Sequence, residues 1–152
     1  MTIITLFVLV FIALAGVLSV GIAVNKQTTT KELGVLSYEV GGLSETDGTE
    51  VDNDYRLRTN FKEADKFEKI EIIEDAAVTY SVFYYNAEKE LIGKTEDLKE
   101  EKTTLPLTQT VEDKVEEVKY FRVVIKPNEE KEKITFFNKG DYVKQLTVTL
   151  SK

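Results

Sequence analysis

The sequence predicts an all-β fold, an antiparallel β-sandwich of about eight strands, preceded by one N-terminal transmembrane helix. Three observations predict it. The first 24 residues carry no charged side chain, and all 47 charged residues lie in the 127 residues from Lys26 to Lys152. Beyond that boundary, apolar and polar residues alternate with the period of two that half-buried strands show. Polar turn signals interrupt the alternation every 8–14 residues, which is the rhythm of a sandwich.

The N-terminal segment, residues 1–25, is interpreted as a membrane anchor. Its apolar run, residues 3–24, is 22 residues long. At about 1.5 Å of rise per residue, a helix of this length crosses a hydrocarbon core of roughly 30 Å. A cleaved signal peptide is the alternative, although the run is longer than a typical apolar region and no basic residue precedes it. Small residues at Ala15, Ser19 and Ala23 share one helix face, a pattern that would let the helix of a second copy approach closely; an ordinary span that faces lipid is the simpler alternative.

Residues 26–32 are expected to form a linker to a β-sandwich domain at 33–152. The two lysines that flank the apolar run, Lys26 and Lys31, follow it, and the positive-inside rule alone would place the domain in the cytoplasm. We expect the opposite, a single-pass protein with an extracytoplasmic C-terminal domain. This preference is an analogy with other β-domains on a lone N-terminal anchor.

The strands are expected in the following order. Alternating or β-branched stretches predict strands at 36–40, 55–61, 70–72, 78–85, 91–92, 105–111, 118–126, 134–137 and 146–150. Two of them, 78–85 and 118–126, are apolar on both faces and predict central strands. Asp47-Gly48 predicts a hairpin turn, and Pro106 predicts an edge strand. No convincing helix is expected after the anchor, beyond a single turn within 111–118.

The composition excludes several functions. The chain has no histidine and no cysteine, so imidazole bases, thiol nucleophiles, disulfides and His or Cys metal sites are excluded. A net charge of −7 argues against a nucleic-acid partner, which requires Lys and Arg on one face. No catalytic motif is present, and we expect a protein that is not an enzyme.

Three stretches resemble a known family. They are Tyr55-Arg56-Leu57-Arg58-Thr59, Val82-Phe83-Tyr84-Tyr85-Asn86 and Lys119-Tyr120-Phe121-Arg122-Val123. Their order resembles the galactose-binding-like, jelly-roll carbohydrate-binding modules of phage tail and bacterial surface proteins. The resemblance implies a jelly-roll sandwich that binds a sugar or a protein partner, and it transfers no binding residue. The chain departs from the pattern in having Asn86 where Asp is common, and in lacking tryptophan.

Five residues are candidates for ligand binding. Arg56 and Arg58 share one strand face, and Arg122 lies on a second strong strand; arginine pairs with carboxylates and stacks on rings. Tyr80 and Tyr84 share one face of the strand at 78–85 and would form an aromatic platform if that face were open. Ion pairs for the arginines and a core role for the tyrosines are the simpler alternatives.

The acidic stretch at residues 45–54 suggests a metal. Asp47, Asp52 and Asp54 offer the hard oxygen ligands that Ca²⁺ prefers, so a structural Ca²⁺ is a candidate cofactor. The stretch lacks the spacing of an EF-hand loop, and a solvated hairpin loop is the alternative.

These observations together predict a membrane-anchored surface binding module that recognises a glycan or a protein. The alternative is a structural or assembly component of a membrane or virion. An open groove that contains Arg and Tyr side chains would favour binding, and a flat apolar patch would favour assembly.

Overall fold

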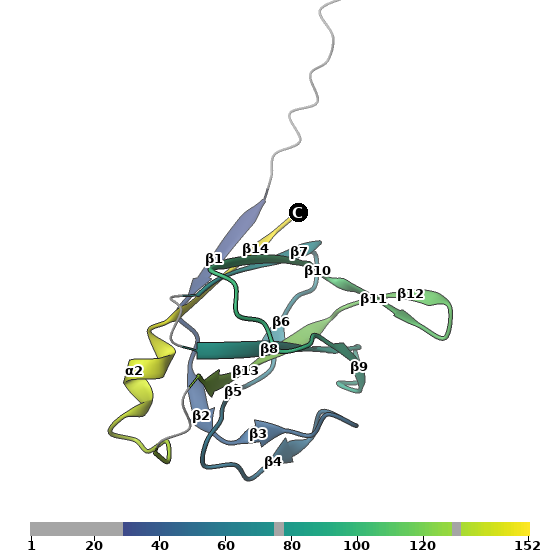
Figure 1. Cartoon of the computed structure of the whole chain (residues 1–152). Coiled ribbons are helices and arrows are strands. Elements are labelled where there is room, and N and C mark those ends of the chain that lie inside the picture. The colour runs from purple at the N-terminus through teal and green to yellow at the C-terminus, as the bar shows by residue number, and fades with distance from the viewer. Residues whose placement is uncertain (1–28, 75–77, 129–131) are drawn as a thin grey trace, which may run out of the picture.

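The computed structural model describes residues 29–74, 78–128 and 132–152. Within these ranges the chain forms fourteen strands and one short helix, α2 (Lys139–Val143), which confirms the all-β class. Figure 1 shows three tiers. Strands β14 (Leu146–Ser151), β7 (Lys69–Glu74) and β10 (Lys102–Pro106) lie above, and β8 (Val78–Tyr85), β13 (Tyr120–Pro127) and β5 (Leu57–Thr59) lie in the middle. The hairpin of β3 (Gly42–Leu43) and β4 (Glu50–Val51) lies below.

The first sheet is antiparallel and has four strands. Their spatial order is β1 (Thr30–Gly34), β14 (Leu146–Ser151), β7 (Lys69–Glu74) and β10 (Lys102–Pro106). Pro106 ends β10 at the edge of this sheet, as the sequence predicts, because an edge strand tolerates a residue without an N–H donor.

The second sheet has six strands and contains the two strong strands. Five strands follow in the order β2 (Tyr38–Val40), β5 (Leu57–Thr59), β13 (Tyr120–Pro127), β8 (Val78–Tyr85) and β9 (Leu91–Lys94), and β6 (Lys62–Glu63) also pairs with β13. Strands β13 and β8 pair along eight residues, from Tyr120 opposite Tyr85 to Pro127 opposite Val78.

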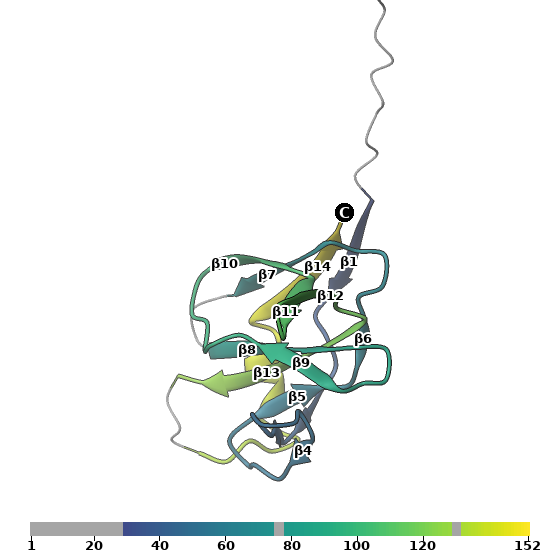
Figure 2. The same ribbon diagram turned by 90° about the vertical axis from the view of Figure 1, so that its right-hand side faces the viewer.

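The core lies between the two sheets (Figure 2). Ile70, Ile72 and Val148 face it from the first sheet, and Val82 and Val123 face it from the second; all five are fully buried. Apolar side chains from two facing sheets give the sandwich arrangement that the alternation predicts.

The second sheet is covered on its outer face as well. There Leu43, Phe83, Tyr85 and Val124 form a second buried cluster beneath the hairpin of β3 (Gly42–Leu43) and β4 (Glu50–Val51). Strand β8 is therefore buried on both faces, which confirms the prediction from its unbroken apolar run.

A second hairpin, β11 (Thr108–Val111) and β12 (Lys114–Glu117), projects from the side of the domain (Figure 1). Its two-residue turn is Glu112-Asp113, and both residues have positive φ, 47° and 64°. The single helical turn expected here is therefore a β-turn, because the strands on each side pair with each other.

Three expected boundaries need correction. The expected strand at 105–111 is broken at Leu107, because β10 ends at Pro106 in the first sheet and β11 begins at Thr108 in the hairpin with β12. Residues 134–137 do not form a strand: the Asn138 side-chain oxygen accepts a 2.7 Å hydrogen bond from the Thr135 N–H, which closes a turn before α2. The expected linker at 26–32 overlaps β1, because Thr30 and Lys31 pair with Ser151 and Leu150 of β14.

The expected span at residues 3–24 and the contact through Ala15, Ser19 and Ala23 lie outside the described residues. In the described ranges, none of the helical structure reaches the length and apolar character that a bilayer crossing requires.

Candidate functional site

The candidate site lies where the β3–β4 hairpin covers the outer face of the second sheet. The hairpin turns at Asp47-Gly48, as predicted, and the N–H of Gly48 donates a 2.8 Å hydrogen bond to the carbonyl of Ser44. The Tyr85 hydroxyl donates a 2.9 Å hydrogen bond to the carbonyl of Gly48. The turn is thereby fixed to strand β8, and burial raises the pKa of Tyr85 to about 12.

Arg58 fixes the other end of the hairpin. Its Nη1 donates to the carbonyls of Val51 and Gly42, at 3.2 and 3.4 Å. Gly41, at φ 143°, passes so close that a Cβ there would collide with the Arg58 guanidinium. The glycines at the start of β3 therefore let the backbone approach this arginine.

Arg122 is the most buried charged group of the site, with only 2% of its surface exposed. Its Nε donates a 2.7 Å hydrogen bond to the carbonyl of Thr59, and its guanidinium lies 4.9 Å from the centre of the Phe61 ring. A buried guanidinium requires a carboxylate partner, and Glu50 supplies it.

Glu50 bridges two arginines. Its Oε1 accepts from Nη2 of Arg122 at 2.7 Å, and its Oε2 accepts from Nη2 of Arg58 at 2.9 Å. The hydrogen bond from Arg122, with the nearby charge of Arg58, holds the pKa of Glu50 below its usual range. We call Glu50, Arg58 and Arg122 the arginine clamp.

A groove of about 230 Å³ opens beside the clamp, between the hairpin and the outer face of the sheet. Its walls carry charges of both signs, and the surface that it presents to solvent is mainly polar. The lining residues are Gly42, Leu43, Glu45, Val51, Asn53, Arg56, Ser81, Phe83, Asp97, Val124 and Lys126. We call this space the hairpin groove.

The charges of the hairpin groove are loosely paired. Lys126 lies 4.0 Å from Asp97, and Lys94 lies 3.5 Å from Glu45, with three of these four side chains at least 40% exposed. Such exposed pairs exchange readily with water, so the groove offers donors and acceptors to a ligand. Arg56 contributes its guanidinium to the wall and donates to the carbonyl of Tyr55 at 2.9 Å.

The structure brings the three predicted arginines to one side of the sheet, but not the two predicted tyrosines. Tyr80 and Tyr84 are each 1% exposed and point into the core between the sheets, whereas Phe83 and Tyr85 face the hairpin. Alternation along β8 places the two pairs on opposite faces. Tyr80 and Tyr84 are thus core residues rather than part of the groove.

The three predicted metal ligands do not converge on one site, and each has a different environment. The carboxylate of Asp47 accepts from the N–H and hydroxyl of Thr49, at 3.1 and 2.8 Å, which closes the hairpin turn. Asp54 pairs with Lys133 at 2.6 Å, and Asp52 is exposed. In residues 29–74, 78–128 and 132–152, no group of three or more carboxylates is arranged to hold a metal ion.

Two contributors to the site were missed from the sequence. Glu50 belongs to the acidic stretch that suggested calcium, and nothing in its neighbours distinguishes it from Glu45 or Asp52. Phe83 lies in a strand whose two faces are equally apolar.

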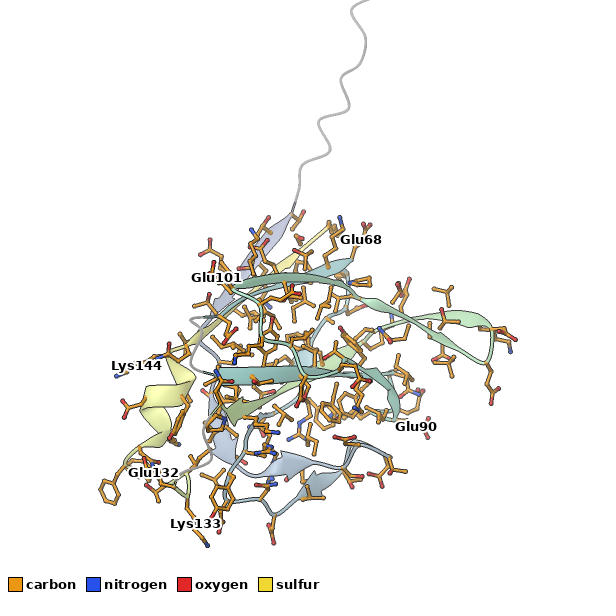
Figure 3. The ribbon with its side chains drawn as sticks, in the orientation of Figure 1. Glu68, Glu90, Glu101, Glu132, Lys133 and Lys144 are labelled. Atoms are coloured by element: carbon orange, nitrogen blue, oxygen red, sulfur yellow. The ribbon has the colours of Figure 1, made fainter. Side chains whose placement is uncertain are left out.

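Most labelled charged side chains in Figure 3, such as Glu68, Glu101 and Lys144, lie around the outside of the domain.

No protein-family model and no curated protein matches this chain. A function for this chain is therefore inferred from the arginine clamp and the hairpin groove.

Proposed function

We propose that this protein is a non-catalytic binding module that recognises a carbohydrate in the hairpin groove and is held at a membrane by residues 3–24. The hairpin groove itself is the observation that supports it. The groove is a concave space whose exposed lining is mainly polar, with side chains of Asn53, Arg56 and Asp97 in its walls. Hydrogen-bond donors and acceptors that converge on one concave space suit a small polar ligand.

A saccharide suits the groove better than a strongly charged or a purely apolar ligand. Two cations, Arg56 and Lys126, and two anions, Glu45 and Asp97, line the walls. Hydroxyl groups donate and accept hydrogen bonds, so they can pair with both kinds of side chain.

The resemblance to galactose-binding-like jelly-roll modules supports the same proposal. It joins the all-β fold to a sugar-binding role and to proteins displayed on phage and bacterial surfaces. The uncharged run at 3–24, long enough for a bilayer, supports a membrane tether. Placement of the domain outside the cytoplasm is proposed by analogy with other β-domains on a lone N-terminal anchor.

A saccharide panel tests the proposal. The full-length chain in mild detergent is screened against mono- and oligosaccharides, and hits are measured by calorimetry. Lys126→Ala, in the groove wall, is expected to weaken binding at least fivefold. Lys114→Ala, on the β11–β12 hairpin, removes the same charge outside the groove and is the matched control. Equal affinities of the two variants, or no binding to any saccharide, would overturn the proposal.

The tether has its own test. The full-length chain is expected to remain in the membrane pellet after carbonate extraction and to be cut by protease added to intact cells. Release into the supernatant would argue against the tether. Protection from protease until the membrane is broken would place the domain on the inner side.

A structural or assembly role is the second candidate, because of an exposed aromatic pair. Phe136 and Phe137 are 78% and 94% exposed on the loop before α2, with their ring centres 5.9 Å apart. Exposed large apolar side chains commonly mark protein contacts. The double change Phe136→Ser and Phe137→Ser would then reduce oligomer mass in analytical ultracentrifugation, and unchanged mass would remove this candidate.

A further inference from the structure

The three arginines of the chain are concentrated at one place. The chain has seventeen lysines and only three arginines, Arg56, Arg58 and Arg122. Arg58 and Arg122 form the arginine clamp, and Arg56 lines the adjoining hairpin groove. Arginine differs from lysine in presenting a planar fork of donors that fits carboxylate and sulfate groups. The fold therefore gathers its anion-binding side chains beside the groove.

The clamp holds an anion that belongs to the protein itself. Arg122 and Arg58 have side chains that are 2% and 12% exposed, but the Glu50 side chain between them is 51% exposed. Two guanidinium groups fixed in the protein thus converge on one carboxylate that solvent reaches. This is the geometry of an anion site occupied by an intramolecular carboxylate.

The guanidinium groups are positioned by other contacts and do not depend on Glu50 alone. Arg122 is held by the Thr59 carbonyl and the Phe61 ring, and Arg58 by the carbonyls of Val51 and Gly42. Of the described residues, none accepts a hydrogen bond from Nε of Arg58, which is buried. A donor of the Arg58 fork thus remains unused when Glu50 is bound.

Glu50 lies on a short, exposed strand that leaves its side chain free to rotate. Strand β4 has two residues, both exposed, and among the described strands its one partner is β3. Rotation of its side chain into solvent requires no change in the main sheets. The next residue, Val51, lines the hairpin groove, so the clamp and the groove are neighbours along the same strand.

We propose that the arginine clamp binds the carboxylate or sulfate group of an acidic saccharide, and that Glu50 occupies the clamp until this group displaces it. The inference rests on the proposed function, because the sugar ring would occupy the hairpin groove. Glu50 is then an internal competitor, and the free protein keeps its buried arginines paired when no ligand is present.

The test uses sodium sulfate and sodium glucuronate as probes on the full-length chain, at constant ionic strength set by chloride. Binding is followed by NMR shifts of the arginine side chains and by calorimetry. Glu50→Gln removes the competing charge, and we expect it to bind one or both probes at least tenfold more tightly than the natural chain. A larger gain for glucuronate identifies a carboxylate ligand, and a larger gain for sulfate identifies a sulfated one.

Glu112→Gln is the matched control, because Glu112 is exposed at the turn between β11 and β12, outside the hairpin groove and the arginine clamp. Adding Arg58→Lys to Glu50→Gln keeps the positive charge but removes the planar guanidinium donors. This double variant should lose the increase in affinity for the probes. If Glu50→Gln does not fold, Glu50→Asp takes its place, since its shorter side chain cannot bridge both arginines.

The inference fails if Glu50→Gln and Glu112→Gln bind the probes equally, or if Glu50→Gln still binds them more tightly after Arg58→Lys is added. This failure is distinct from failure of the proposed function. The natural chain could bind neutral saccharides through Lys126 while Glu50→Gln binds sulfate and glucuronate no more tightly. That result would support the groove proposal and contradict the anion site. If Glu50→Gln binds sulfate more tightly but no saccharide binds to any variant, the clamp is an anion site and the groove proposal is wrong.

Discussion

Glu50 and Arg122 lie 72 residues apart in the sequence and form an ion pair of 2.7 Å between Oε1 and Nη2. The pair joins the small β3–β4 hairpin to strand β13, whose apolar face belongs to the core. Its two partners differ in environment, because the arginine is buried and the carboxylate is half exposed. The hairpin is thus attached to the sheet by an ion pair. Its loss would leave the buried Arg122 guanidinium without a charged partner.

Removal of the carboxylate is expected to destabilise the domain. Glu50→Ala leaves the Arg122 guanidinium buried without its charged partner, and we expect a loss of about 1–3 kcal/mol in the free energy of unfolding. Urea denaturation measures it. Glu45→Ala, which removes an exposed carboxylate on the same hairpin, should change stability by less than about 0.5 kcal/mol. Equal losses in the two variants would contradict the role of the clamp.

The hairpin turn should tolerate no side chain at Gly48. Gly48 has φ 69°, and a Cβ there would lie 2.7 Å from the Tyr85 hydroxyl. Gly34→Ala is a matched control, because Gly34 has φ 63° and no atom within 4 Å of the added Cβ. We expect Gly34→Ala to cost about 1 kcal/mol from backbone strain and Gly48→Ala about 2–3 kcal/mol from strain and collision. Thermal denaturation that ranks them in the opposite order would refute this account of Gly48.

The stability contributed by Glu50 should depend on pH. The pKa of Glu50 is lower in the folded protein than the ordinary value of 4.5. A lowered carboxyl pKa gives stability that is present above the unfolded pKa and is lost as pH falls through the folded pKa. The difference in unfolding free energy between the natural chain and Glu50→Gln should thus be constant from pH 7 to about 5 and shrink below about 4.5. A difference that persists unchanged at pH 2 would contradict the charged pair.

Two buried tyrosine hydroxyls should behave in opposite ways. The Tyr38 hydroxyl has no hydrogen-bond partner in the described part of the chain, and burial raises its pKa. Tyr38→Phe is expected to be neutral or to stabilise by about 1 kcal/mol, because it removes a buried, unpaired polar atom. Tyr85→Phe removes the hydrogen bond to Gly48 and should cost about 1–2 kcal/mol. Calorimetric unfolding of both variants checks the contrast, and equal effects would overturn it.

The turn of the projecting hairpin is expected to be improvable. Glu112 and Asp113 both have positive φ in a two-residue turn, a conformation that Asn-Gly adopts more readily. The double change Glu112→Asn and Asp113→Gly should therefore raise the free energy of unfolding by about 1 kcal/mol. Glu116→Asn on strand β12 removes one charge without touching the turn and should not reproduce the gain. A destabilised double variant would show that other contacts set this turn.

The sequence predicts the fold where the strands are long. Alternation at 146–150 matches the buried and exposed pattern of β14, and the unbroken apolar run at 78–85 matches a strand buried on both faces. It does not predict β3 and β4, which have two residues each, because so short a strand carries no readable period. It also mistakes 134–137 for a strand, where two phenylalanines are exposed by a turn that Asn138 closes.

The candidate site is predicted in part. Arginine chemistry identifies Arg56, Arg58 and Arg122, and the structure places all three on the outer side of one sheet. The period of two correctly groups Tyr80 with Tyr84 and Phe83 with Tyr85, but it does not indicate which pair faces the core. Both faces of β8 are covered, so the two assignments have the same hydrophobic pattern.

By itself, the sequence determined that this chain folds as antiparallel β-structure behind an uncharged leader, because alternation and composition are local properties. Only the tertiary structure decided that Glu50 closes on Arg58 and Arg122, and that a groove opens beside them. Contacts between residues 8 and 72 positions apart are selected by how the sheets pack and how buried charges find partners. No short stretch of the sequence contains that information.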